Sequence, residues 1–328
     1  MQTKNKSIIA AILLVLLLVG GLITGFTQKA LPLQFGKEGT PKVAVVVKTL
    51  TGDVFQLKMA EAARDRAIAL GAEAEIYQAG GQTAVNQMVS IIEDLIQKQV
   101  DIIIISPLDR KAVGPAFEEA KAAGIIIVLM DQGADGQDYA TLLATDNYKA
   151  GALAADYARE LLADQGKILV VEGAPGSEAG DRRRDGFKEN VVKGGIEIVG
   201  SQSGMWTTEG AMKAMENMLQ AHPEAELVYS CSDVMVAGIL EAIKNAGKED
   251  QIKVISFDGS SVGIEFIKAG KIMATMAQYP VRNGVLAADI GLGLWHETIS
   301  ADALPKYIDT GTNLITIDNA DEALKESF

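Results

Sequence analysis

From residue 41 onward the sequence alternates between short apolar runs and longer amphipathic segments. Runs such as VAVVV (43–47) and DIIIIS (101–106) are continuous and rich in β-branched residues, as is typical of strands buried on both faces. Segments such as 55–71 and 83–99 have the 3.6-residue apolar period of helices. This alternation predicts an α/β fold in which helices cover both faces of a parallel sheet.

The pattern restarts near residue 150 and continues through a stretch of similar length, so we expect two α/β domains. No Pro- or Ser-rich linker separates them, which predicts domains that lie close together. The predicted strands are 43–47, 73–79, 101–106, 125–131, one within 140–147, 167–173, 196–202, 225–233, 252–259, 273–280 and 313–318. The predicted helices are 55–71, 83–99, 113–124, 150–163, 182–195, 209–222, 234–247, 262–270 and 281–299.

Charge and residue usage exclude several kinds of function. The net charge of −13 disfavours a nucleic-acid partner, because such proteins usually carry a basic surface. One cysteine, Cys231, and two histidines, His222 and His296, do not indicate a Cys–His catalytic pair or a zinc site. The segments SSVGIEF and KNAGKED lack the spacing of a calcium loop. We therefore expect no metal and no cofactor.

The N-terminus carries an export signal. MQTKNK holds two lysines and no acid, and no charged residue follows from Ser7 to Phe26. This segment is either the apolar part of a signal peptide or a transmembrane anchor, and TQKALPLQ offers no good cleavage site. Because the lysines precede the apolar run, we expect the rest of the chain outside the cytoplasm, free or tethered by residues 7–26.

Polar and aromatic side chains follow nearly every predicted strand. Turns and helix caps favour Asp, Asn and Ser, and Asp146 and Asp233 in particular look like caps or hinge residues. A role in turns or helix caps does not explain why Lys, Arg, Gln and Trp also follow strands. Open parallel sheets bind ligands at the carboxyl ends of their strands, so these residues are candidates for a binding site. The candidate ligand-binding residues are Lys48, Phe55, Ser106, Asp131, Gln132, one of Arg182, Arg183 and Arg184, Trp206, Ser232, Asp258 and Gln278.

These residue types favour a neutral sugar as the ligand. Sugar hydroxyls both donate and accept hydrogen bonds, which carboxylates, amides and guanidinium groups can fix in place. The C–H face of a sugar ring can stack on aromatic rings such as Phe55 and Trp206.

At these residues the sequence resembles the periplasmic sugar-binding proteins of the ribose/allose/galactose type, over about residues 41–320. The motifs that carry the resemblance are AVVVKTL with a downstream Phe, VLMDQG, ATDN, EGAPGSEAGDRRRDGF, SQSGMW, YSCSDVMVAG, ISFDG and ATMAQYP. Aligned through DGF, the ligand-binding arginine is Arg183. The sequence is most similar to the allose-binding members, which also carry a lysine after the first strand, as Lys48 does here.

The resemblance implies a type I periplasmic binding protein fold: two Rossmann-like lobes joined by crossing segments near 145–147, 278–280 and 308–311. The lobes would be 41–145 plus 280–308, and 146–279 plus 309–320, after a leader at 1–30. Departures from the family pattern at Gly52, Val54, Gln132 and Ser232 remove hydrogen bonds and stacking area. Because of these departures, a deoxysugar or a quorum-type furanose is an alternative ligand to an aldohexose or pentose.

The function that the resemblance implies is a monomeric solute-binding protein that closes on a monosaccharide and delivers it to an ABC importer permease. A second hypothesis is a tethered sensor that presents its ligand to a chemoreceptor or sensor kinase. The effector domain of a LacI-type repressor is disfavoured because residues 1–40 hold no helix-turn-helix. An enzyme is disfavoured because no nucleophile–base constellation or phosphate loop is present.

Overall fold

The computed structural model describes residues 37, 39–81 and 83–328. The predicted leader at residues 1–30 lies outside this part of the chain. Within the described part, no helix combines the length and apolar character needed to cross a membrane.

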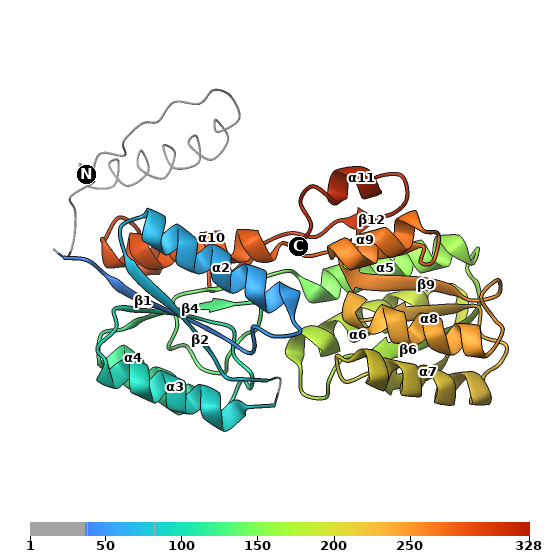
Figure 1. Ribbon diagram of the computed structural model, residues 1–328, viewed down its shortest axis with the longest axis horizontal. Coiled ribbons are helices and arrows are strands. Elements are labelled where there is room, and N and C mark those ends of the chain that lie inside the picture. The colour runs from blue at the N-terminus through green and yellow to red at the C-terminus, as the bar shows by residue number, and fades with distance from the viewer. Residues whose placement is uncertain (1–36, 38, 82) are drawn as a thin grey trace. The chain divides into compact units, whose positions relative to one another are not determined.

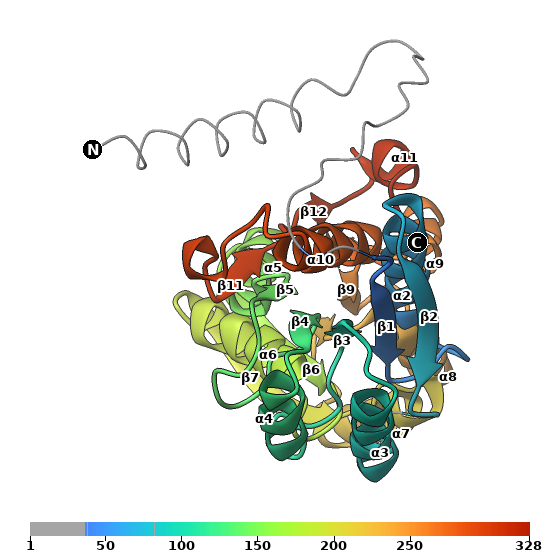
Figure 2. The ribbon, with the colours of Figure 1, turned by 90° about the vertical axis from the view of Figure 1, so that its left-hand side faces the viewer.

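The first sheet is entirely parallel and has the strand order β11-β5-β4-β3-β1-β2, which Figure 2 shows from the side of this lobe. Its strands are β1 (Lys42–Val47), β2 (Glu73–Gln78), β3 (Ile102–Ile105), β4 (Ile126–Met130), β5 (Leu142–Ala144) and β11 (Tyr307–Asp309). The edge strand β11 was not predicted from the sequence.

Helices cover both faces of this sheet (Figure 1). Alternate β1 residues point to opposite faces, because side chains of a strand alternate. Val43, Val45 and Val47 pack in a core with α2 and α10, whereas Ala44 and Val46 pack in a second core with α3 and α4. These helices are α2 (Val54–Ala69), α3 (Val85–Gln97), α4 (Gly114–Ala122) and α10 (Pro280–Trp295).

The second sheet has the order β12-β10-β9-β8-β6-β7 and is parallel except for the pairing of β12 with β10. Its strands are β6 (Gln165–Glu172), β7 (Gly195–Ser203), β8 (Leu227–Ser230), β9 (Lys253–Asp258), β10 (Ala274–Ala277) and β12 (Leu314–Ile315). Its helices are α5 (Asn147–Leu161), α6 (Glu178–Val191), α7 (Thr208–Ala221), α8 (Val236–Asn245), α9 (Ser261–Lys268) and α11 (Ala320–Ala323). Two short 3₁₀ turns are η1 (Asp233–Met235) and η2 (Ala301–Ala303).

Two predicted elements are shorter in the structure than in the sequence pattern. The apolar run at 313–318 forms a strand only over Leu314–Ile315, because two residues pair with β10. The helix predicted at 281–299 ends at Trp295, and Glu297 adopts a left-handed φ of 56°. The α/β prediction with two parallel-dominated sheets is confirmed.

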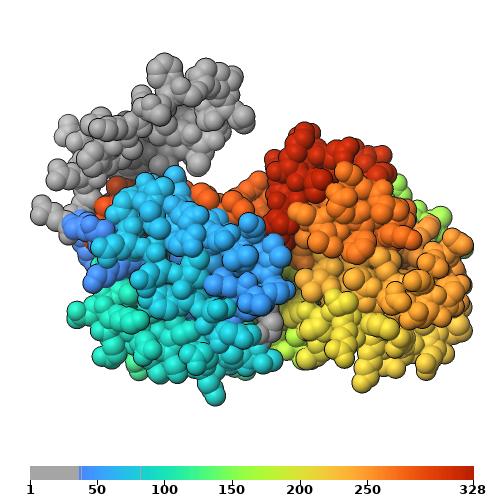
Figure 3. All heavy atoms as spheres, viewed as in Figure 1, coloured from blue at the N-terminus to red at the C-terminus, as the bar shows by residue number. Residues whose placement is uncertain are grey.

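The two sheets share one topology, and this places the site. Each sheet has its first strand between its second and third, with the fourth and fifth following on one side. In such sheets the crevice beside the first and third strands binds ligands at the carboxyl ends. Figure 3 shows the lobe drawn in blue to green meeting the lobe drawn in yellow to orange.

Candidate functional site

A buried polar cluster lies at the carboxyl ends of β1, β3 and β4. Asp131, directly after β4, accepts three hydrogen bonds on Oδ2: from Lys48 Nζ at 2.8 Å, Ser106 Oγ at 3.0 Å and Gln56 Nε2 at 3.1 Å. Lys48 Nζ also donates to Gln132 Oε1 at 3.0 Å. Three neighbouring strands and the first turn of α2 therefore converge on one carboxylate.

The charges of this cluster stabilise each other away from water. Lys48 is 8% exposed and Asp131 is 9% exposed. Burial is the largest single influence and acts to raise the pKa of Asp131. The charge and hydrogen bond of Lys48, together with Arg183 and Ser106, outweigh burial, so the pKa lies below its usual range. Asp131 is therefore an ionised hydrogen-bond acceptor at neutral pH.

A matching cluster lies at the carboxyl ends of β8, β9 and β10. Asp258, the last residue of β9, accepts on Oδ1 from Gln278 Nε2 at 2.7 Å and Arg183 Nη1 at 3.1 Å. Its Oδ2 accepts from Ser232 Oγ at 2.6 Å and from the backbone N of Asp233 at 3.1 Å. Burial raises the pKa of Asp258, and the Arg183 charge opposes this shift.

Arg183 is held in one orientation on α6. Its Nε donates to Asn147 Oδ1 at 2.8 Å and its Nη1 to the backbone oxygen of Cys231 at 2.9 Å. The guanidinium carbon lies 3.9 Å from the ring centroid of Phe257, a cation–π contact. The side chain of the neighbouring Arg182 is 51% exposed, so the fold selects Arg183 for the buried position.

Trp206 lies beside Arg183 because two glycines leave room for its ring. A Cβ atom at Gly173 would come within 2.1 Å of the Trp206 ring, and one at Gly180 within 2.8 Å. The guanidinium of Arg183 lies 5.8 Å from the indole centroid. Trp206 has a φ of 58°, a left-handed conformation that a bulky residue seldom adopts.

The two clusters lie near enough to affect each other electrostatically, so we treat them as one candidate site. The positive charge of Arg183 contributes to the lowered pKa of Asp131. The pKa of Asp53, the N-cap of α2, is raised mainly by burial, with a further contribution from the negative charge of Asp258. Arg110 of the first lobe also lies 3.4 Å from Glu178 of α6.

The structure places all ten predicted residues at this junction or beside it. Nine belong to the two clusters or the Trp206 contact. The tenth, Phe55, is the half-buried second residue of α2 and precedes Gln56.

Sequence reasoning missed three contributors and misjudged one. Gln56, Asn147 and Phe257 were not predicted. Gln56 is detectable because it continues the buried stripe of α2, where a polar residue is out of place. Asp233 was expected as a cap or hinge residue, but Ser232 caps η1, while Asp233 accepts from Ser260 and Thr275 inside the lobe.

Two further features of the described residues are the state of the buried cysteine and the arrangement of potential metal ligands. Burial raises the pKa of Cys231 to about 12, so its thiol stays protonated. Across residues 37, 39–81 and 83–328, no three His, Cys, Asp or Glu side chains are placed to hold a metal ion.

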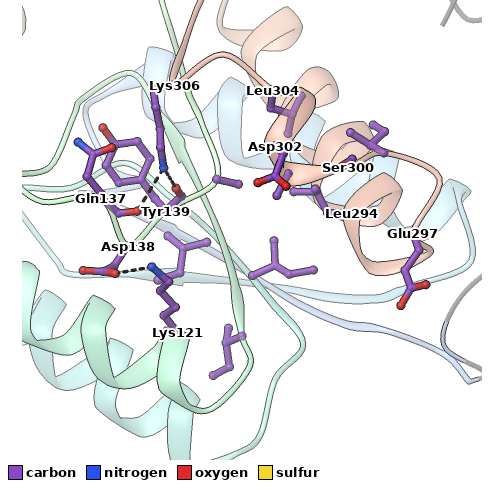
Figure 4. A pocket seen from close by; sticks show the side chains of 16 residues that line it. Lys121, Gln137, Asp138, Tyr139, Leu294, Glu297, Ser300, Asp302, Leu304 and Lys306 are labelled. Carbon is purple, nitrogen blue, oxygen red and sulfur yellow. Dashed lines mark hydrogen bonds and ion pairs between the residues drawn. The ribbon is translucent and has the colours of Figure 1, made fainter. Parts of the chain in front are cut away.

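A cavity of ≈ 880 Å³ on the first lobe lies away from this site (Figure 4). It borders the amino end of β4, opposite the end that carries Asp131. Its lysines are bonded to neighbours: Lys121 Nζ lies 2.7 Å from Asp138 Oδ1, and Lys306 Nζ lies 2.6 Å from the backbone oxygen of Tyr139. The cavity is therefore not part of the candidate site.

Comparisons with known proteins agree with this geometry. Residues 43–297 match the family described as periplasmic binding protein domain. The chain is 34% identical to the ribose import binding protein RbsB of Bacillus subtilis (strain 168), covering 84% of this chain and 90% of that protein. It is 30% identical to the D-allose-binding periplasmic protein of Escherichia coli (strain K12), covering 76% and 80%.

A solved structure gives the same result for the fold. The periplasmic solute-binding protein of an ABC transporter from Actinobacillus succinogenes 130z, crystallised with D-allose, superposes with a TM-score of 0.80. It is 27% identical in sequence, and the match covers 86% of this chain and 100% of that one.

Proposed function

Because this chain belongs to the periplasmic binding protein domain family, we propose that it binds a monosaccharide between its lobes and delivers it to an ABC importer. The ligand is an aldohexose or pentose of the allose or ribose kind. Relatives named for ribose and allose binding support this ligand class. The observation that carries the proposal is the pair of buried aspartates, Asp131 and Asp258, one at each sheet.

In the first lobe the hydroxyl groups of the sugar bind Asp131 and Lys48. Asp131 accepts on its carboxylate, and Lys48 and Gln132 exchange part of their present hydrogen bonds for bonds to the ligand. Ser106 holds the carboxylate in place. Phe55 stacks on the ring.

In the second lobe Arg183 and Gln278 donate to the sugar and Asp258 accepts. Charge-assisted hydrogen bonds of this kind are stronger than neutral ones. Ser232 fixes Asp258, and Trp206 supplies a second aromatic surface.

Binding follows a hinge mechanism. The lobes are residues 41–145 plus 280–308, and 146–279 plus 309–320, and the chain crosses between them near 145–147, 278–280 and 308–311. The sugar contacts both aspartates only when the lobes are closed, so it shifts the population toward the closed form by its differential affinity.

The closed form is then recognised by a partner. In transport the partner is an ABC permease, and the protein acts as a monomer without catalysing a reaction. Family membership supports a periplasmic location. The apolar segment 7–26 of the sequence favours a second function, in which a tethered form presents the sugar to a chemoreceptor or sensor kinase.

The test is a thermal-shift screen of residues 31–328 against pentoses, hexoses, deoxyhexoses, polyols and amino acids, followed by calorimetric titration of each hit. A ligand at about 100 times its Kd adds ~2.7 kcal/mol to the free energy of unfolding, a readily measured shift. One strong monosaccharide hit is expected. No sugar or polyol hit with folded, ligand-free protein would refute the proposal.

A matched pair of variants tests the site itself. Arg183→Met removes the buried guanidinium, whereas Arg182→Met removes a largely exposed one on the same helix. We expect the first to abolish measurable sugar binding and the second to leave the Kd nearly unchanged. Equal effects of both variants would place the sugar elsewhere.

A further inference from the structure

The last residue of the described chain contacts both lobes. The backbone oxygen of Phe328 accepts from Ser261 N at 3.0 Å and from Ser261 Oγ at 2.8 Å. Ser327 Oγ lies 2.9 Å from Ser261 Oγ. Ser261 begins α9, three residues after Asp258, so this anchor lies beside the second polar cluster.

The Phe328 ring reaches the other lobe. Its centroid lies 5.5 Å from that of Phe55, with an interplanar angle of 74°, an edge-to-face contact. By contrast, the Ala323 and Leu324 side chains before it pack on the core of the second lobe. Figures 1 and 2 both show the C-terminal end beside α2 and α9.

Phe55 connects this contact to the binding site. It is followed by Gln56, which donates to Asp131, and preceded by Val54, which is 51% exposed. The Phe328 ring, in contact with Phe55, therefore orients an aromatic residue that is adjacent in sequence to Gln56 of the first polar cluster. The contact also joins α2 to α9, so it exists only while the lobes lie against each other.

We propose that Phe328 is an affinity-determining residue of the sugar site: it orients the Phe55 ring and stabilises the closed lobes through an aromatic contact. This inference rests on the proposed function. Phe328 acts through Phe55 and is a positioning residue. Its contact adds to the differential affinity for the closed form, because it is lost when the lobes separate.

The first test measures sugar affinity, using the monosaccharide with the largest shift in the screen. Phe328→Leu keeps an apolar side chain and removes the ring, and we expect a Kd about tenfold higher, mainly through faster dissociation. Phe328→Tyr keeps the ring and should restore most of the affinity. The matched control is Arg110→Gln, which breaks a partly exposed contact between the lobes and should change the Kd little.

The second test measures the coupling between the two rings in the closed form. In urea unfolding at a saturating concentration of that sugar, Phe55→Leu, Phe328→Leu and the double variant form a cycle. We expect the double variant to be no less stable than the worse single one, because either change removes the same contact. Additive losses of stability in the double variant would overturn the inference. An unchanged Kd of Phe328→Leu, measured with a sugar that the wild type binds, would also overturn it. A wild type that binds no sugar would instead refute the proposed function.

Discussion

Asp131 and Asp258 occupy corresponding places in the two lobes, and both adopt a left-handed backbone. Each terminates the fourth strand of its sheet, with φ angles of 64° and 125°. Non-glycine residues adopt such angles at a cost, and Asp tolerates them better than most because its side chain is short and polar. The strained backbone turns both carboxylates toward the ends of the neighbouring strands, where their donors lie.

Asp131→Asn tests the charge without disturbing this backbone, because Asn also tolerates positive φ. The variant leaves the Lys48 ammonium without its anion, so we expect sugar affinity to fall about tenfold or more and stability to fall by about 1–3 kcal/mol. Calorimetry and urea unfolding measure the two effects. Asp135→Asn, at a partly exposed ion pair with Arg110, should cost less than ~1 kcal/mol. Equal losses in both would contradict the role given to Asp131.

Gln56→Met should weaken binding by loosening Asp131. Its amide donates to Asp131 Oδ2 and its oxygen lies 3.4 Å from Lys48 N, so the variant removes both contacts at nearly constant volume. We expect a stability loss of about 1 kcal/mol and a several-fold higher Kd. Gln97→Met, at the exposed end of α3, is the control. An unchanged Kd for Gln56→Met would remove Gln56 from the site.

Gly173→Ala should displace Trp206. The added methyl group would lie 2.1 Å from the indole, so the ring must move, at a cost of about 1–3 kcal/mol. In a Trp295→Phe background, the emission of Trp206 reports this movement. Gly114→Ala has nothing within 4 Å of the new atom and should leave the emission unchanged. The same spectrum for both variants would mean that the ring does not rest on Gly173.

Tyr229→Phe should leave stability unchanged or raise it by about 1 kcal/mol. The Tyr229 hydroxyl is fully buried and has no hydrogen-bond partner within the described part of the chain. An unpaired buried hydroxyl is destabilising, and its removal keeps the stacked ring of Phe187, whose centroid lies 4.0 Å away. A loss larger than ~1 kcal/mol in urea unfolding would reveal a partner for the hydroxyl.

Asp233 makes stability depend on pH. Burial, followed by the negative charge of Asp258, raises its pKa to about 7. At a pH between the two pKa values, the folded state therefore holds a proton that the unfolded state, with a pKa of ~3.9, has lost. The stability from this group is present at acidic pH and is lost as pH rises from about 4 to 7.

Asp233→Asn should remove this loss. We expect the free energy of unfolding of the variant relative to wild type to increase between pH 5 and pH 8, as measured by urea unfolding. Comparing the two proteins at each pH cancels the contribution of other groups such as Asp131. A constant difference across this range would show that Asp233 is already ionised at pH 5.

The sequence predicts most of the strands because they are continuous apolar runs, and it predicts the site because polar residues follow them. Where a residue type is unusual for a cap, as for Lys48 and Gln278, the residue itself supports the prediction. The choice of Arg183 among three consecutive arginines needs the family resemblance. Gln56 was not predicted because it lies inside a helix and does not follow a strand.

One short element could not be predicted for a different reason. β11 comprises three residues and is defined by pairing with β5, a strand far away in the chain. Such a segment has no period of its own to detect. The position of Phe328 likewise depends on two long-range contacts, with Ser261 and Phe55, that no local pattern encodes.

The first lobe is completed by late parts of the chain, and this determines the order in which a nascent protein can fold. Helix α10 covers the stripe of α2 that includes Met59 and Ala63, with Gly284 in close contact with the backbone of both. A ribosome must therefore translate the whole second sheet up to β10 before the N-terminal core can close. Until then the N-terminal lobe lacks one face of its core, which suits the export that the proposed function entails.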